Sequence, residues 1–437
     1  MLDVISLASH LDAAGPRPRS SRHWATTRLP TSFHALAFAV VVCSPTLARA
    51  TTPWALDRID QPDLPLDGAP FLLAPSTTSL APSRADPRSC PGAGVHIFLL
   101  DAPVDEHHPQ FAGRVHPTHD ARAPIHRTRP TASASAPDPR TSTESLDAVA
   151  ERRRKASCLA HGTAVASAAA ASDLGVARCA ELHPVRIFDC DGRGTVTDLL
   201  RGISHVSVAV RRPEMRPAVV VVSVGGGRDA AVDAAVDDLA KDAFVVVAAG
   251  NQRGDACARS PAAAEGAFTV SATDEVDVRS PFANWGRCVD AFAPGARVRV
   301  AAPDGWNDER PGNPGNPGDG MTVPGDPGDG TRLAHGTSIA APLAGGLGAV
   351  FLSWAPNATA EETRRAIFAA GAAGRVRDAG DEGEGNRVLG TEGLARAAEE
   401  IHARGIERAT TRVSCAWFWG GRGAAFGGRA EALEGCF

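Results

Sequence analysis

Ala218-Val219-Val220-Val221-Val222-Ser223-Val224 is an almost unbroken run of β-branched residues. A strand with one solvated face alternates apolar and polar residues, whereas a continuous run is typical of a strand buried on both faces. Phe244 to Ala249 has the same character, and Asp229 to Asp242 between them has the apolar spacing of a helix. This order predicts parallel strands of one buried sheet, joined by a crossover helix.

The same alternation continues on both sides of this unit. Val95 to Leu100 is a short apolar strand that ends at Asp101, and Val185 to Phe188 is another. Helices are expected over Thr197 to Val210, Ser338 to Trp354 and Glu361 to Ala370, with a small, Ala-rich helix over Gly162 to Ala171. The predicted fold class is α/β, with a mostly parallel central sheet and helices on both of its faces.

Length and composition narrow the functional classes. The chain has 437 residues, of which 43% are hydrophobic and 22% charged, which excludes a small disulfide scaffold and a wholly disordered chain. Its formal net charge of -5 argues against nucleic-acid binding through bulk positive charge. No apolar run reaches the ~18–20 residues of a membrane span, and a monomer is the default expectation.

The first fifty residues have the order of a secretory signal. Several Arg residues precede an apolar stretch from Phe33 to Cys43, and Ala48-Arg49-Ala50 is a small-x-small cleavage pattern. We therefore expect a signal peptide over 1–50, one exported main domain over 51–405 and a tail over 406–437. Segments 113–157 and 303–332, rich in Pro, Ser, Thr and Arg or in Gly, Pro and Asp, are expected to be surface insertions.

Four polar residues at the ends of predicted strands or helices could form a hydrolytic site. Ser338 opens a helix and could act as a nucleophile if His161 served as its general base and Asp101 oriented that imidazole. Asn251, directly after a buried strand, could donate a hydrogen bond to the developing oxyanion. Each residue alone is more simply a cap or a turn former, so their common order carries the hypothesis.

Read together, these motifs resemble the subtilases, and most closely their proteinase K-like branch. The chain order Asp, His, Ser is the known order of subtilisin. The matching segments are Gly94-Val95-His96-Ile97-Phe98-Leu99-Leu100-Asp101, His161-Gly162-Thr163-Ala164-Val165-Ala166, Val222-Ser223-Val224-Gly225-Gly226-Gly227, Ala248-Ala249-Gly250-Asn251, Phe282-Ala283-Asn284-Trp285-Gly286, Phe292-Ala293-Pro294-Gly295, Gly336-Thr337-Ser338-Ile339-Ala340-Ala341-Pro342, and Trp54-Ala55-Leu56-Asp57-Arg58-Ile59.

The resemblance implies a role for each of these residues. Ser338 would be the nucleophile, His161 the base, Asp101 its orienting carboxylate and Asn251 the oxyanion donor, and no cofactor would be needed for the chemistry. His335 copies the His161 motif but lies where the family enters its serine motif. The substrate peptide would lie along an edge strand and a pocket, formed by Arg193, Gly194, Ser223, Val224, Gly225, Ala248, Ala249 and Gly250.

Disulfides and calcium also follow from the resemblance. Nine cysteines, eight of them beyond the signal, suit an exported chain, although eight cysteines alone allow 105 pairings. The family pattern implies the pairs Cys158–Cys190 and Cys257–Cys288, and leaves Cys90, Cys179, Cys415 and Cys436 open. It also implies a structural calcium site, whose ligands would be the carbonyls of Glu265 and Ala267 and the Asp290 carboxylate.

Two departures from the family pattern keep a second function open. Asp101-Ala102-Pro103 replaces the usual Asp-Thr/Ser-Gly, and Pro103 has no N–H to donate to the Asp101 carboxylate. The segment between Ala50 and Pro53 has no room for a folding-assisting propeptide, so we expect folding without one, an incomplete gene model, or a helper that acts in trans. The primary prediction is a secreted serine endopeptidase that acts on proteins or peptides; the alternative is a pseudoprotease that binds polypeptides through the same cleft. A lipase or esterase of the α/β-hydrolase class would instead need Gly-x-Ser-x-Gly.

Overall fold

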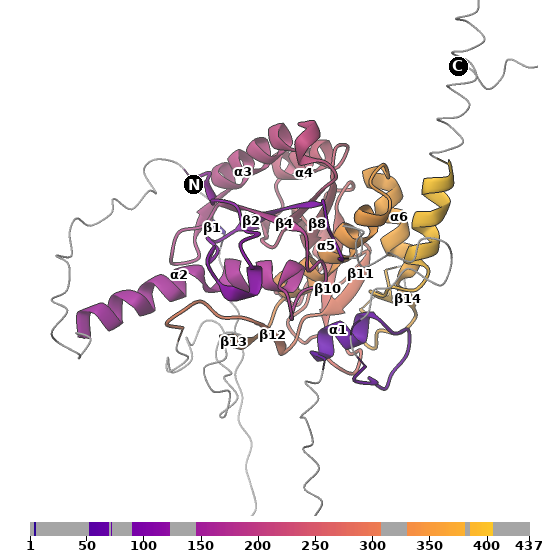
Figure 1. Ribbon diagram of the computed structural model, residues 1–437, viewed down its shortest axis with the longest axis horizontal. Coiled ribbons are helices and arrows are strands. Elements are labelled where there is room, and N and C mark those ends of the chain that lie inside the picture. The colour runs from indigo at the N-terminus through magenta and orange to yellow at the C-terminus, as the bar shows by residue number, and fades with distance from the viewer. Residues whose placement is uncertain are drawn as a thin grey trace, which may run out of the picture.

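The computed structural model describes residues 4–5, 52–69, 71, 90–122, 146–306, 330–380 and 385–404. The predicted signal region apart from 4–5, the tail 406–437 and the cysteines Cys43, Cys415 and Cys436 lie outside the described residues. Figure 1 shows the arrangement of the helices α1 (Trp54–Ile59), α2 (Leu146–Ala170), α3 (Val196–Ala209), α4 (Ala230–Leu239), α5 (Thr337–Trp354) and α6 (Ala360–Ala370).

The central sheet confirms the predicted fold class. Among the described residues it has nine strands in the order β14-β15-β11-β10-β8-β6-β2-β4-β3, all paired in parallel except β14 with β15. These strands are β2 (His96–Asp101), β3 (His119–Asp120), β4 (Glu181–Arg186), β6 (Ala218–Val222), β8 (Phe244–Ala248), β10 (Phe268–Thr273), β11 (Ala291–Pro294), β14 (Ala372–Ala373) and β15 (Arg387–Val388).

Alternate residues of the buried strands face two separate layers of helices. Val219 and Val221 of β6 belong to the hydrophobic core that contains α2 and α5. Val220 and Val222 belong to the core that contains α3 and α4 on the opposite face. Figure 1 shows these two layers on either side of the sheet. The run of valines at 219–222 therefore fills both cores, which explains why it lacks polar alternation.

Short strand pairs complete the fold beside the main sheet. β12 (Val298–Ala301) pairs with β13 (Thr331–Ala334), and β7 (Gly226–Gly227) pairs with β9 (Arg259–Ser260), both antiparallel. β5 (Gly194–Thr195) pairs antiparallel with β1 (Val4–Ile5). The edge of β5 thus accepts an antiparallel extended segment, which is the geometry that peptide binding by strand addition requires.

Helix α2 corrects the expectation for segment 113–157. Residues 119–120 form β3 of the main sheet, and α2 begins at Leu146, so His161 lies inside a 25-residue helix and does not open it. Residues 146–160 contain no Pro or Gly and are rich in Ala, Glu, Arg and Lys, which are strong helix formers. The other predicted insertion is shortened in the same way, because Thr331 and Arg332 belong to β13.

Helix α5 is apolar because it lies in the core. It is the one helix of the described residues that is long and apolar enough to cross a membrane, yet 94% of it is buried inside the protein. A core helix of a water-soluble fold has the same composition. Its N-terminal end reaches the carboxyl-terminal edge of the sheet, where Thr337 and Ser338 begin the helix.

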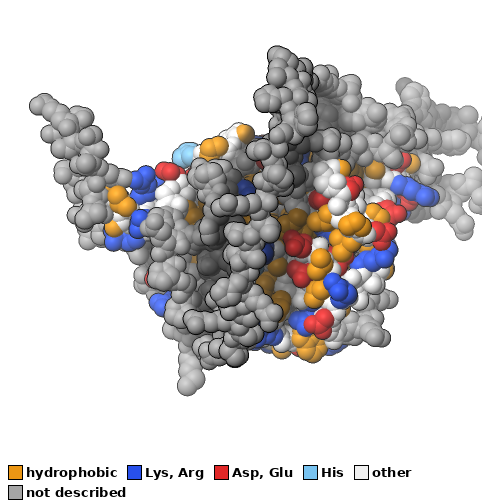
Figure 2. All heavy atoms as spheres, turned by 90° about the horizontal axis from the view of Figure 1, so that it is seen from below, with side chains coloured by type: hydrophobic (Ala, Val, Ile, Leu, Met, Phe, Trp, Pro, Cys, Tyr) orange, Lys and Arg blue, Asp and Glu red, His pale blue; other side chains and the backbone are white. Residues whose placement is uncertain are grey.

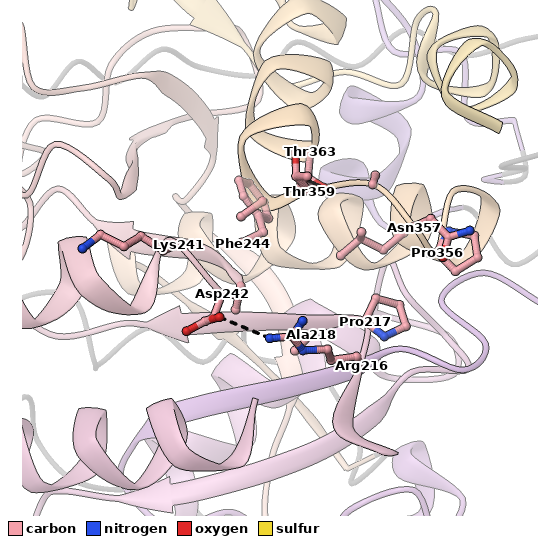
Figure 3. A pocket seen from close by; sticks show the side chains of 14 residues that line it. Arg216, Pro217, Ala218, Lys241, Asp242, Phe244, Pro356, Asn357, Thr359 and Thr363 are labelled. Atoms are coloured by element: carbon pink, nitrogen blue, oxygen red, sulfur yellow. Dashed lines mark hydrogen bonds and ion pairs between the residues drawn. The ribbon is translucent and has the colours of Figure 1, made fainter. Parts of the chain in front are cut away.

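A polar cavity of about 500 Å³ lies at the opposite edge of the sheet. Its walls include Ala218 and Phe244, the first residues of β6 and β8, and the Arg216 guanidinium pairs there with Asp242 at 3.2 Å. Figure 3 shows these side chains around the cavity. The candidate catalytic residues lie near the other edge of the sheet, which is formed by the C-terminal ends of the parallel strands. This cavity is therefore separate from them.

Three histidines, two of them in the strands β2 and β4, make stability dependent on pH. His183 and His96 share a hydrogen bond, with 2.9 Å between Nε2 of His183 and Nδ1 of His96. The His183 ring also stacks on the His116 ring. Burial, followed by the proximity of His116 and His96, lowers the pKa of His183 from 6.5 to about 3. The folded pKa lies below the unfolded one, so this group's contribution to stability is present above pH 6.5 and is lost as the pH falls.

We expect His183→Gln to flatten the acid side of the stability profile. At pH 5 the buried imidazole should cost the folded state about 1–2 kcal/mol relative to pH 7, and the variant should not pay that cost. Urea unfolding between pH 4.5 and 7.5 would measure it, with the exposed His402→Gln as the matched control. Equal acid slopes in all three proteins would contradict the assignment.

Candidate active site

Three segments far apart in the sequence bring Asp101, His161 and Ser338 together. Asp101 ends β2, His161 lies in α2 and Ser338 is the second residue of α5. His161 Nδ1 lies 2.6 Å from Asp101 Oδ1, and His161 Nε2 lies 3.1 Å from Ser338 Oγ. If Nδ1–H donates to the carboxylate, the lone pair of Nε2 faces the serine hydroxyl and can accept its proton.

Burial differs among the three residues in a way that suits their roles. Asp101 is 1% exposed, whereas the His161 side chain is 27% exposed. A shielded carboxylate interacts more strongly with an imidazolium than a solvated one does, because the local dielectric constant is lower. The partly open imidazole can meet a substrate from outside.

The second oxygen of the Asp101 carboxylate has no donor. Ala102 N donates to Asp101 Oδ1 over 2.6 Å, while Oδ2 is buried and has no hydrogen-bond partner among the described residues. Pro103 is the residue whose missing N–H was expected to weaken this support. An unmade hydrogen bond to a buried charged oxygen costs free energy, so the orienting carboxylate is held less firmly than two donors would hold it.

Asn251 is oriented toward Ser338 by its neighbour in α5. Asn251 Oδ1 accepts hydrogen bonds from Thr337 N and Thr337 Oγ1, each over 3.0 Å, so the amide nitrogen points the other way. Gly336 has φ +138°, and a methyl group added there would lie 2.8 Å from Ser338 Oγ and 3.4 Å from Asn251 Nδ2. Both atoms therefore border one small space, where a substrate oxygen could receive the amide hydrogen bond.

Comparison with known proteins agrees with this geometry. Residues 92–390 match the model of the subtilase family, described as Peptidase_S8. This chain belongs to the subtilase family. The four predicted site residues that the structure brings together all lie within the matched region of this subtilase.

The relatives and a solved structure are described as serine proteinases. The subtilase is 33% identical over 333 residues to an extracellular serine proteinase of Thermus sp. (strain Rt41A), covering 76% of this chain and 64% of that protein. It is 29% identical over 337 residues to alkaline serine exoprotease A of Vibrio alginolyticus, covering 77% and 49%. The chain thus spans less than two thirds of either relative. A cold-adapted subtilisin-like serine proteinase structure matches with a TM-score of 0.56 and 27% identity, covering 78% of this chain and 98% of that one.

Two of the residues expected to bind a substrate backbone contact the first two residues of α5 in this subtilase. Ser223 Oγ donates to Ser338 O over 3.1 Å, and the Gly250 N–H donates to Thr337 Oγ1 over 3.0 Å. Val224 and Gly225 follow Ser223 toward β7, while Ala248 ends β8 and Ala249 and Gly250 follow it.

On the other flank, Arg193 precedes β5, and its N–H donates to Asp189 Oδ1 over 2.9 Å, which fixes the loop before Gly194.

Sequence reasoning missed two supporting residues. Thr337 holds the Asn251 carboxamide, and Asn284, fully buried, donates to Ala249 O and accepts from the N–H groups of Gln252 and Gly254. Asn284 belongs to the family-like segment Phe282-Ala283-Asn284, but its sequence context does not indicate which loop it stabilises. His335 is separate from the triad, because its Nδ1 accepts a hydrogen bond from the Arg297 N–H.

Three disulfides join parts of the described chain. Cys158–Cys190 links α2, one turn before His161, to the loop before β5, and Cys257–Cys288 links the loop after Asn251 to the segment before β11. These are the two pairs that the resemblance implied. Cys90–Cys179, which sequence reasoning left open, is the third.

The residues expected to bind calcium do not fit that ion in this arrangement. Asp290 Oδ1 pairs with Arg364 Nη2 over 2.7 Å, and Oδ2 accepts from Thr269 N over 2.7 Å. Burial raises the pKa of Asp290, and both oxygens of its carboxylate already have partners within the protein. Among the described residues no group of three or more His, Cys, Asp or Glu side chains is placed to hold a metal ion.

Gly162→Ala should disable the site without touching a catalytic side chain. An added methyl group at Gly162 would collide with the backbone oxygen of Ala102 and lie 2.6 Å from that of Pro103. Helix α2 must then move away from Asp101, and a displacement of ~1 Å in a catalytic geometry costs about 10²-fold in rate. We expect kcat/KM to fall by about that factor.

A matched glycine tests whether the loss comes from this contact. A methyl group at Gly254 would meet only Gln252 O, at 3.9 Å, so Gly254→Ala should keep nearly full activity. Helix propensity alone would make Gly162→Ala stabilising by about 1 kcal/mol. Unchanged kcat/KM in Gly162→Ala would show that the close approach of α2 to residues 102–103 is not required.

Proposed function

We propose that this subtilase is a secreted serine endopeptidase. The single observation that carries the proposal is the hydrogen-bonded series from Asp101 Oδ1 through His161 to Ser338 Oγ. The oriented Asn251 amide beside Ser338 Oγ supports it. Protein or peptide substrates suit the edge strand β5 and the glycine-rich β7, and the protein is taken to act as a monomer.

The reaction follows from what each group can donate or accept. Ser338 Oγ attacks the peptide carbonyl carbon while its proton passes to His161 Nε2, and the carbonyl oxygen gains negative charge. Asn251 Nδ2 and the free N–H of Ser338, at the N-terminal end of α5, can donate to that oxygen. His161 then gives the proton to the leaving amine, and a water molecule, deprotonated by the same imidazole, hydrolyses the acyl-enzyme and restores Ser338.

The alternative is a pseudoprotease that binds polypeptides in the same cleft without cleaving them. One observation favours it: Asp101 Oδ2 is buried without a donor, next to Pro103. The alternative predicts peptide binding with no reaction at Ser338.

Labelling with a fluorophosphonate probe tests the proposal directly. Such probes phosphonylate a serine that is activated by a base and an oxyanion site, so we expect the folded protein to gain one probe mass at Ser338 and to cleave a casein substrate. Heat-denatured protein is the control and should not be labelled. Folded protein that neither reacts nor cleaves would overturn the endopeptidase proposal in favour of the pseudoprotease.

Secretion is a separate part of the proposal. It rests on the basic, apolar and small-x-small order of residues 1–50 and on the disulfides of the described chain. N-terminal sequencing of protein recovered from the medium should begin near Thr51. Protein retained in the cell with an intact N-terminus would refute export.

A further inference from the structure

Helix α2 extends well beyond the residue that it supplies to the triad. It begins at Leu146, fifteen residues before His161, and in Figure 1 its first turns project from the body of the protein. Residues 151–155 read Glu-Arg-Arg-Arg-Lys and are all exposed. We call residues 151–155 the basic arm.

The basic arm concentrates positive charge on an acidic protein. It holds Arg152, Arg153, Arg154 and Lys155 against Glu151, whose carboxylate pairs with Arg154 Nε over 3.0 Å. The formal charge of residues 151–155 is therefore +3, in a chain with a formal net charge of -5, and Arg152 and Arg153 also have interaction partners in the fold. Figure 2 shows Lys and Arg side chains at the left-hand end of the molecule, where α2 leaves the body in Figure 1.

The neighbouring hairpin packs against the same part of α2. Arg332 of β13 donates to Ala160 O, the residue before His161, over 3.1 Å, and its guanidinium stacks on the Trp306 ring at 5.0 Å. Gly305 lies against the Arg152 side chain, and the exposed Asp304 beside it is an acidic group of the same loop. Arg332 therefore fixes the root of the arm close to the triad.

The position of the arm relative to the reacting atoms follows from helix geometry. At a rise of ~1.5 Å per residue, Lys155 lies about 9 Å and Arg152 about 14 Å along α2 from His161. An extended peptide covers ~3.3 Å per residue, so these distances correspond to about 3–4 residues of a bound chain. A long substrate can reach the arm, whereas a dipeptide anilide held at Ser338 spans only ~7 Å and cannot.

We propose that the basic arm is an exosite that binds acidic stretches of a polypeptide substrate, several residues away from the cleaved bond. This inference rests on the proposed function. An acidic polypeptide fits the arm better than a nucleic acid or a membrane does. The arm belongs to the same helix as His161, and Cys158–Cys190 ties this helix to the loop before β5, the strand proposed to hold the substrate. The net negative charge of the chain opposes broad binding to a polyanionic surface.

The expected effect is on substrate capture and is sensitive to salt. A single exposed ion pair contributes little, but four like charges attract an acidic segment together and raise its encounter rate. At ~20 mM ionic strength the screening length exceeds the length of the arm, whereas at ~0.5 M it falls to a few ångströms. We expect a preference for acidic flanks of about 10-fold in kcat/KM at low salt, lost at high salt.

Two long peptides and one short one provide the test. The long peptides share one cleaved core and carry either Glu or Gln on both flanks; the short one is a dipeptide anilide. The variant R152Q/R153Q/R154Q/K155Q should lose the Glu-over-Gln preference and keep its rate on the dipeptide. The ratio between the two long peptides does not depend on the fraction of active enzyme, so partial misfolding cannot imitate the result.

Two control variants make the result specific to the arm. R365Q/R375Q/R396Q/R404Q removes the same number of charges from exposed residues near α6 and the C-terminal end of the described chain and should keep the preference. R152K/R153K/R154K keeps the charge of the arm and should also keep the preference for the Glu-flanked peptide.

Equal rates on both long peptides in the wild type, or a preference that survives in the Gln variant, would overturn the proposal. So would tight, arm-dependent binding of anionic vesicles with no preference among peptides.

Failure of the proposed function gives a different result. If no peptide is cleaved by the wild type, fluorescence anisotropy still measures binding of the labelled Glu-flanked peptide. Arm-dependent binding without cleavage would support the exosite and reject the endopeptidase. Cleavage without a flank preference would support the endopeptidase and reject the exosite.

Discussion

Ser338→Ala is expected to lower kcat by about 10⁶-fold, the scale measured for the triad serine of subtilisin. The residual rate should come from the oxyanion site and substrate binding alone, because the variant keeps Asn251 and the strands beside it. His161→Ala should cost about as much, and the double variant should cost no more than either single one, because the two residues act as a unit. Single-turnover assays at a known concentration of folded enzyme would measure these rates.

A nearby histidine supplies the control for this prediction. His335 lies three residues before Ser338 in the sequence but accepts a hydrogen bond from Arg297 N, away from the triad. His335→Ala should therefore keep kcat within a few fold. A loss in His335→Ala that equals the loss in His161→Ala would show that the base has been assigned to the wrong residue.

Arg58→Met should have the largest effect on stability. The Arg58 side chain is fully buried, and its guanidinium pairs with both oxygens of Asp277, over 2.7 and 2.8 Å. It also donates to Gln61 O over 2.8 Å. Methionine fills a similar volume but leaves the Asp277 carboxylate buried without a partner, and such a change costs about 3–5 kcal/mol.

A double-mutant cycle separates the lost ion pair from lost packing. Asp277 has φ +58°, a conformation that Asn tolerates, so Asp277→Asn removes the charge without backbone strain. The double variant R58M/D277N should be more stable than R58M, because no buried charge is left alone. Urea unfolding in the Ser338→Ala background, which prevents self-digestion, gives the free energies; a cost below 1 kcal/mol for R58M would contradict the prediction.

The buried strands and the triad could be predicted because their signals are local. Valines at 219–222 require two apolar environments whatever the rest of the chain does, and the sheet places them between two helix layers. Asp101, Ser223 and Ala248 to Asn251 all lie at the C-terminal ends of parallel strands or directly after them, so the topology alone gathers them at one edge.

The errors arose where composition was averaged or where contacts are long-range. Segment 113–157 was read as one Pro- and Ser-rich insertion, although residues 146–160 favour a helix and extend α2. The pairing of Cys90 with Cys179 spans 89 residues, and the Arg364–Asp290 ion pair spans 74. A single sequence carries no signal for such distances, which depend on how helices and loops pack.

The bridge between Cys158 and Cys190 has a practical consequence for production. It connects the helix that carries His161 to the loop before β5, so one covalent bond ties the base to the strand expected to hold the substrate. In a reducing bacterial cytosol thiols stay unpaired. Material purified from that compartment would lack the cross-link, and weak turnover would then reflect the expression host and not the residues of the catalytic centre. Recombinant preparations therefore belong in an oxidising compartment, with bridge formation checked by mass spectrometry before any kinetic constant is assigned.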